Sequence, residues 1–284
     1  MQEVLLMRWR NLLSLALIAL AIGALSALPA DSAAEGLSSE WAKGHNSRAR
    51  LIAGKGLAGV ELQMPEGWKT YWRNPGDAGG VPPSFDWSRS ENLAEAEVLY
   101  PAPKRFSDRF GDTVGYKNMV VFPVRLTAKD PAKPIGLHLA LDYGVCKEIC
   151  IPAEAALTLD ISADAPPVPR QLVAALDRVP QPAQEKMPSD PTLKRVVLEL
   201  AGERPHIVLE TKFPGGGAHA DAFVEVPSGS FVPLPKKTAD DGGGNVTFEI
   251  DLSSDVDVED LKGQSLTATL VSDEGQSEVK FDIH

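Results

Sequence analysis

The chain has 284 residues, 43% of them hydrophobic, and a formal net charge of −11 at pH 7. That length allows one large or two medium domains. A chain this acidic repels phosphate backbones and anionic lipid, and its sequence has no basic cluster with interleaved aromatic residues, so we expect no nucleic-acid partner.

The first predicted element is a signal peptide over residues 1–34. Arg8 and Arg10 form a basic start, residues 12–25 form an apolar core, and the small residues up to Ala34 form a cleavage site. The apolar run is shorter than the roughly 20 residues that a spanning helix needs. We therefore expect an exported mature chain that does not span the membrane. An uncleaved anchor is the alternative.

Residues 35–162 are predicted to form an all-β domain. Its candidate strands are short, and Gly, Pro and Asn turns separate them, which is typical of a sandwich of about seven strands. These strands are expected at 47–53, 59–64, 68–73, 95–99, 119–126, 135–143 and 154–161.

The next segment, 163–191, is rich in proline and is predicted to be a linker, with one short helix over 170–178. From 192 to 284 the period-two pattern returns, for example at Val196, Leu198 and Leu200. The expected fold class is therefore all-β, with two immunoglobulin-like or β-sandwich domains joined by a Pro-rich linker.

The chain's two cysteines, Cys146 and Cys150, are expected in the loop between two of these strands. A disulfide across so short a loop removes little unfolded-state entropy, about 2 kcal/mol at best. A structural disulfide would more usually join strands distant in sequence. The spacing therefore favours a redox couple, and a structural disulfide stays open as the alternative.

The corresponding reaction is thiol–disulfide exchange through a mixed disulfide. Lys147 would favour a thiolate and Glu148 would oppose it, so the sequence leaves the attacking cysteine open. The histidines are scattered, which argues against a metal site within the chain, and we expect no cofactor. Hydrolase chemistry has no supporting motif.

Three stretches resemble the N-terminal periplasmic domain of the DsbD family of thiol:disulfide interchange proteins. The first is Leu139–Cys146 together with Cys150-Ile151-Pro152-Ala153-Glu154. The second is Asp108-Arg109-Phe110-Gly111 with Tyr116 and residues 121–124, and the third and weaker one is 67–73. The resemblance covers about residues 47–162.

This resemblance implies an immunoglobulin-like sandwich in the periplasm, in which Cys146 and Cys150 exchange the disulfide. It also implies a cap loop in which Phe110 shields the pair while Asp108 and Gly111 shape the cap. The neighbouring residues would be Tyr71, Tyr116 and Tyr143. For each aromatic residue, ordinary core packing is the alternative.

The resemblance further implies a protein-disulfide reductase that passes electrons to periplasmic thioredoxin-like oxidoreductases. Family members carry a membrane bundle and a thioredoxin-like domain that this sequence lacks, so we expect a separately encoded membrane electron transporter as donor. Residues 192–284 look like the longer N-terminal region of the suppressor-of-copper-sensitivity branch. The cysteine spacing is closer than in the best-known members. A binding or assembly module with a structural disulfide, or a copper-handling protein, are the alternative functions.

Overall fold

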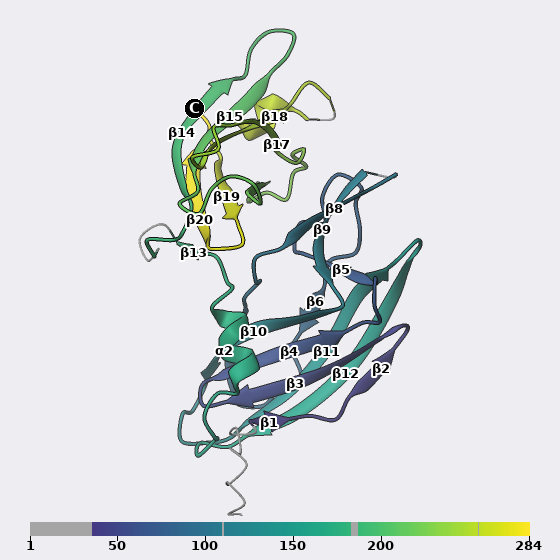
Figure 1. Cartoon of the computed structure of the whole chain (residues 1–284). Coiled ribbons are helices and arrows are strands. Elements are labelled where there is room, and N and C mark those ends of the chain that lie inside the picture. Colours follow the sequence, from purple (N-terminus) through teal and green to yellow (C-terminus); the bar gives the residue numbers. More distant parts are fainter. Residues whose placement is uncertain (1–35, 110, 183–186, 255) are drawn as a thin grey trace, which may run out of the picture. The chain divides into compact units, whose positions relative to one another are not determined.

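The computed structural model describes residues 36–109, 111–182, 187–254 and 256–284. The predicted signal peptide lies outside these residues. Within them, strands form four sheets, which make two β-sandwiches (Figure 1). The prediction of an all-β chain with two sandwich domains is confirmed.

The first sheet of the first sandwich has the order β1-β3-β4-β10-β7, and β2 pairs with β3. The antiparallel β3–β4 pair runs in continuous register, from Arg48 opposite Gln63 to Gly54 opposite Leu57, whereas the β10–β7 register shifts between Thr127 and Ala128. Its strands are β1 (Leu37–Ser38), β2 (Ala42–Gly44), β3 (Ser47–Gly54), β4 (Leu57–Gln63), β7 (Leu93–Val98) and β10 (Met119–Ala128).

The second sheet has the order β12-β11-β5-β9-β8, and β6 pairs with β11. Strands β11 and β12 form one long hairpin (Figure 1). The strands are β5 (Lys69–Tyr71), β6 (Ser84–Asp86), β8 (Lys104–Asp108), β9 (Gly111–Lys117), β11 (Ile135–Cys146) and β12 (Cys150–Ile161).

The core of this sandwich follows from the period-two pattern. Leu137, Leu139 and Leu141 are at most 2% exposed and face the interior, because alternate side chains of a strand point to one side. The sequence did not predict β8 and β9. This hairpin has glycines at 111 and 115 and charged residues on both strands, for example Lys104, Arg105 and Asp112, so it lacks the apolar alternation that marks the other strands.

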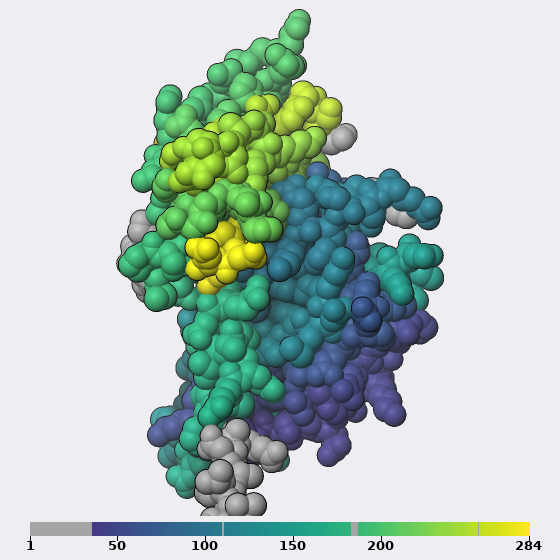
Figure 2. Space-filling model, viewed as in Figure 1, coloured from purple at the N-terminus to yellow at the C-terminus, as the bar shows by residue number. Residues whose placement is uncertain are grey.

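The segment after the first sandwich holds helix α2 (Arg170–Leu176) and the short strand β13 (Gln181–Pro182). Leu172 is fully buried and packs with Ile52 and Val121 of the first sheet. Gly59 permits this approach, because a Cβ there would lie 2.7 Å from Leu172 Cδ1. Helix α2 lies on the surface of the first sandwich (Figure 2), whereas β13 pairs with β20 of the second.

The second sandwich has sheets of order β13-β20-β19-β16 and β14-β15-β18-β17. Its core contains Phe213, Phe248 and Ile250. The elements are β14 (Thr192–Glu199), β15 (His206–Lys212), β16 (Asp221–Glu225), β17 (Lys236–Asp240), β18 (Asn245–Asp251), α3 (Val258–Leu261), β19 (Ser265–Val271) and β20 (Gln276–Asp282).

Helices are few and short in the part of the chain that the structure describes. Among the residues that the structure describes, none of them is long and apolar enough to cross a bilayer.

Candidate redox site

The β11–β12 hairpin places the two cysteines opposite each other. Its register runs without a break from Ile135 opposite Ile161 to Cys146 opposite Cys150. A disulfide joins this last pair, with a Cα–Cα distance of 4.1 Å. The sequence predicted that the cysteines lie in a loop between two strands. In the structure they are the terminal residues of these strands, and only residues 147–149 form the turn.

The two sulfurs differ in access. Cys146 is 1% exposed, whereas the Cys150 residue is exposed, and Ile149 beside it is 68% exposed. An incoming thiolate must approach a disulfide sulfur directly, and attack on one sulfur releases the other as the leaving group. The geometry thus favours Cys150 as the sulfur that partners reach.

Tyr71 contacts both sulfurs from the adjacent strand. Its hydroxyl oxygen lies 2.9 Å from Cys146 Sγ and 2.8 Å from Cys150 Sγ. Disulfide sulfurs carry no proton, so the hydroxyl is the donor. Burial, and secondarily the charge of Asp108, raise the pKa of Tyr71. The hydroxyl therefore keeps its proton at neutral pH and is available to a thiolate.

Two glycines make room for the Tyr71 ring. A Cβ on Gly80 would lie 2.2 Å from Tyr71 Cε1, and one on Gly144 would lie 3.0 Å from Cε2. The distance calculated at Gly80 is shorter than any that real Cβ atoms show, so a larger residue at this position would displace the Tyr71 ring. Glycine at these positions leaves the space in which the ring lies while its hydroxyl contacts the disulfide.

Lys69 is a buried cation next to the disulfide, since its backbone pairs with Cys146 and its residue is 7% exposed. Its Nζ donates to Thr113 Oγ1 at 2.6 Å and lies 3.4 Å from Asp108 Oδ2. Removing an ammonium from water is costly unless it is paired. Asp108 supplies that pairing, so Lys69 connects β5 to the hairpin that carries the predicted cap.

The predicted cap is the turn of the β8–β9 hairpin, where Asp108 pairs with Gly111. Gly111 has φ +120°, a conformation that L side chains rarely adopt, and it faces Ala78. Asp108 is about 41% exposed and lies beside Tyr71 and Lys69. Phe110, the predicted shield, lies outside the described residues.

The structure places the other two candidate tyrosines away from the sulfurs. Tyr116 is buried among core residues, and its hydroxyl donates to the carbonyl of Pro101 at 2.8 Å. The Tyr143 hydroxyl lies 2.8 Å from Ser47 Oγ. Tyr143 and Cys146 are three residues apart on one strand, so their side chains point to opposite faces. That spacing was a usable sequence signal.

Sequence analysis singled out neither Lys69 nor Thr113. Lys69 lies two residues before Tyr71 and so shares its face, which is a signal that a strand assignment provides. Thr113 comes from a strand 44 positions away, and only the fold brings it to Lys69. Within the described residues, no group of three or more His, Cys, Asp or Glu side chains is placed to hold a metal ion.

The comparisons with known proteins agree with this geometry. Residues 45–161 match the family model described as thiol:disulfide interchange protein DsbD, N-terminal. No curated protein matches the chain in sequence. Among solved structures, the N-terminal periplasmic domain of ScsB from Proteus mirabilis matches with a TM-score of 0.67 and 23% sequence identity, over 87% of this chain and 98% of that one.

The structural match extends beyond the family model and includes most of the second sandwich, and at this identity it shows that the fold is shared. The family model covers the first sandwich with its disulfide. The resemblance predicted from the sequence is thus confirmed: residues 45–161 form a domain of the type found at the N-terminus of the DsbD thiol:disulfide interchange proteins.

Proposed function

We propose that the chain is a periplasmic protein-disulfide reductase that passes electrons to thioredoxin-like oxidoreductases through Cys146 and Cys150. The observation that carries this proposal is the asymmetry of the disulfide. The Cys150 residue is exposed, the Cys146 residue is buried, and the Tyr71 hydroxyl is within hydrogen-bonding distance of both sulfurs.

In the reduced chain, the Cys150 thiolate attacks a sulfur of the partner's disulfide. A mixed disulfide forms, and the partner's second sulfur leaves as a thiolate. The Cys146 thiolate then attacks Cys150 Sγ and releases the partner's first sulfur. Two electrons and two protons have moved to the partner, which becomes a dithiol, and Cys146–Cys150 has become a disulfide.

Tyr71 assists the second step. The Cys146 side chain is buried, and a buried thiolate is unfavourable unless a donor stabilises it. The Tyr71 hydroxyl is that donor, and the Lys69 ammonium adds positive charge to the same face of the sheet. In the oxidised state the same hydroxyl contacts the disulfide, so it needs no rearrangement when the bond breaks.

The cap protects the reduced pair. An exposed thiolate in an oxidising compartment is lost to nonspecific oxidation. Family resemblance assigns the shielding ring to Phe110, and the neighbouring Asp108 lies beside Lys69 and Tyr71. Re-reduction needs a donor dithiol, for which we propose a separately encoded membrane transporter.

Trapping experiments test the assignment of the two cysteines. Cys146→Ser leaves the accessible sulfur without its resolving partner, so it is expected to accumulate a mixed disulfide with an oxidised thioredoxin-like oxidoreductase. Cys150→Ser retains only the buried sulfur and is expected to form little. Equal trapping by both variants would contradict the assignment. If neither variant is trapped and loss of either cysteine only lowers stability, the bridge is structural.

A further inference from the structure

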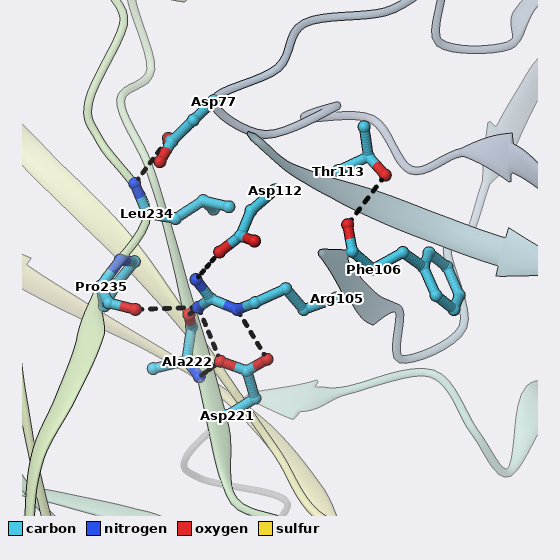
Figure 3. Close-up of polar contacts among 9 residues, drawn as sticks. All are labelled: Asp77, Arg105, Phe106, Asp112, Thr113, Asp221, Ala222, Leu234 and Pro235. Carbon is cyan, nitrogen blue, oxygen red and sulfur yellow. Dashed lines mark hydrogen bonds and ion pairs between the residues drawn. The ribbon is translucent and has the colours of Figure 1, made fainter. Parts of the chain in front are cut away.

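Strand β8 connects the redox site to the second sandwich. Successive side chains of a strand point to opposite faces. Phe106 and Asp108 share the face of Lys69, which lies 3.4 Å from Asp108 Oδ2 and 6.0 Å from the Phe106 ring. Arg105 points the other way and meets residues of the second sandwich, as Figure 3 shows.

The Arg105 guanidinium is almost fully engaged. Nη2 donates to Asp221 Oδ1 at 2.7 Å and to the Pro235 carbonyl at 2.8 Å, and Nε donates to Asp221 Oδ2 at 3.1 Å (Figure 3). Nη1 donates to Asp112 Oδ2 at 3.0 Å. Arg105 is 17% exposed, and these carboxylates raise its pKa further despite burial. One side chain thus binds both strands of the cap hairpin to the second sandwich.

A second contact reaches the same hairpin through the loop before β6. The Leu234 amide of the second sandwich donates to Asp77 Oδ1 at 2.8 Å. One residue later in that loop, the Ala78 amide donates to the Asp112 carbonyl at 3.1 Å. The cap hairpin therefore contacts the second sandwich directly through Arg105 of β8 and indirectly through the loop of Asp77, which reaches Asp112 of β9.

The hairpin lies at the edge of its sheet. In the sheet order β12-β11-β5-β9-β8, β8 is the last strand and hydrogen-bonds to β9 on one side. An edge hairpin held on one side opens more readily than a central strand. The contacts between Arg105 and the second sandwich hold β8 from its other face, the one that points away from the disulfide.

We propose that Arg105 and Asp221 are positioning residues, through which the second sandwich holds the cap hairpin over the redox site. This inference rests on the proposed redox function, and it gives the cysteine-free second sandwich a role. Opening of the cap then requires this contact to loosen, so a partner that displaces the second sandwich widens access to the disulfide, in which Cys146 is buried.

The variant that tests the proposal is Asp221→Asn in the full chain. Asn is nearly isosteric, but it removes the charge that makes the contact strong. Loss of a charge-assisted hydrogen bond is expected to raise the open fraction of the cap about tenfold. Asp221→Glu keeps the carboxylate and should stay close to the wild type.

A matched control is available in Glu225→Gln. Glu225 also joins the two sandwiches, since Arg73 donates to its carboxylate at 2.7 to 2.9 Å, and this ion pair is made to Arg73, which follows β5, instead of to a side chain of β8. If any loosening between the sandwiches were enough to expose the disulfide, Glu225→Gln would act like Asp221→Asn. If the contact to the hairpin is what matters, Glu225→Gln should leave the reaction rates of the disulfide close to those of the wild type.

The readout is the rate at which a small phosphine reduces the disulfide and the rate at which a small aromatic disulfide oxidises the reduced pair. We expect Asp221→Asn to speed both reactions about tenfold while the redox potential stays unchanged, because a cap that opens affects both directions equally. Unchanged rates in Asp221→Asn, or equal acceleration in Glu225→Gln, would overturn the proposal.

These reagents need no protein partner, so the outcome is separate from the trapping experiment. If the reduction and oxidation rates of Asp221→Asn match those of the wild type while the trapping experiment succeeds, the positioning role is wrong and the proposed function is still supported. If Asp221→Asn lowers the unfolding temperature of the chain, amide hydrogen exchange of Arg105–Asp112 in the wild type provides a second test. Protection equal to that of the β11–β12 core would support the proposal, and rapid exchange would contradict it.

Discussion

Replacing Tyr71 by Phe removes the only hydroxyl that the described residues place against both sulfurs, and keeps the ring in its pocket. A hydrogen bond to an ionised group contributes about 1.5–3 kcal/mol, whereas a neutral disulfide is a weak acceptor. The substitution therefore destabilises the Cys146 thiolate more than the disulfide. A difference of ~1.4 kcal/mol lowers the thiolate population at neutral pH roughly tenfold.

Reaction of the reduced protein with an excess of a chromogenic aromatic disulfide separates the two cysteines. The first coloured thiol appears when Cys150 attacks the reagent, and the second appears when Cys146 resolves the mixed disulfide. In Tyr71→Phe we expect the second phase to slow about tenfold at neutral pH and to recover as the pH rises. The first phase should change little.

Tyr143→Phe is the matched control. It also removes one buried tyrosine hydroxyl, here bonded to Ser47 on the opposite face of the same strand as Cys146. Both phases should match the wild type in this variant. An unchanged second phase in Tyr71→Phe, or an equal effect in Tyr143→Phe, would refute the role assigned to the Tyr71 hydroxyl.

Three further predictions follow from the same geometry. Gly80→Ala should slow the resolving phase as Tyr71→Phe does, because its Cβ would lie 2.2 Å from the Tyr71 ring; an unchanged rate would contradict this. Lys69→Met removes the buried ammonium that pairs with Asp108 and so loosens the cap hairpin. A small phosphine should then reduce the disulfide several-fold faster; slower or equal reduction would contradict it. Burial raises the pKa of all four tyrosines above the ordinary value of 10.0, so the unfolded chain ionises first. The free energy of unfolding should therefore fall as the pH rises above about 10, as urea titrations at increasing pH would show; a flat profile would contradict it.

The sequence was sufficient to predict the sandwich class and the hairpin that carries the cysteines. Alternation such as that of Leu137, Leu139 and Leu141 fixes which side of a strand is buried, and this pattern is local. The same rule separates Tyr143 from Cys146. What alternation does not fix is the strand register, which depends on partners far along the chain.

The rest of the site depends on such distant partners. Lys69 meets Thr113 from 44 positions away, and Arg105 meets Asp221 from 116 positions away. No local pattern marks Arg105 as different from any other arginine on a charged strand. Its partners Asp221 and Pro235 meet it only because the second sandwich packs beside β8, so tertiary packing decides its role.

The measurement that tests the central claim most directly is the redox equilibrium of the Cys146–Cys150 pair in the purified protein. The protein is equilibrated in graded thiol buffers, and free thiols are trapped with an alkylating mass tag and counted. A working electron carrier should titrate at a potential of roughly −120 to −270 mV, the range of known exchange proteins. A bridge that resists reduction until well below about −300 mV would be structural and would contradict the account.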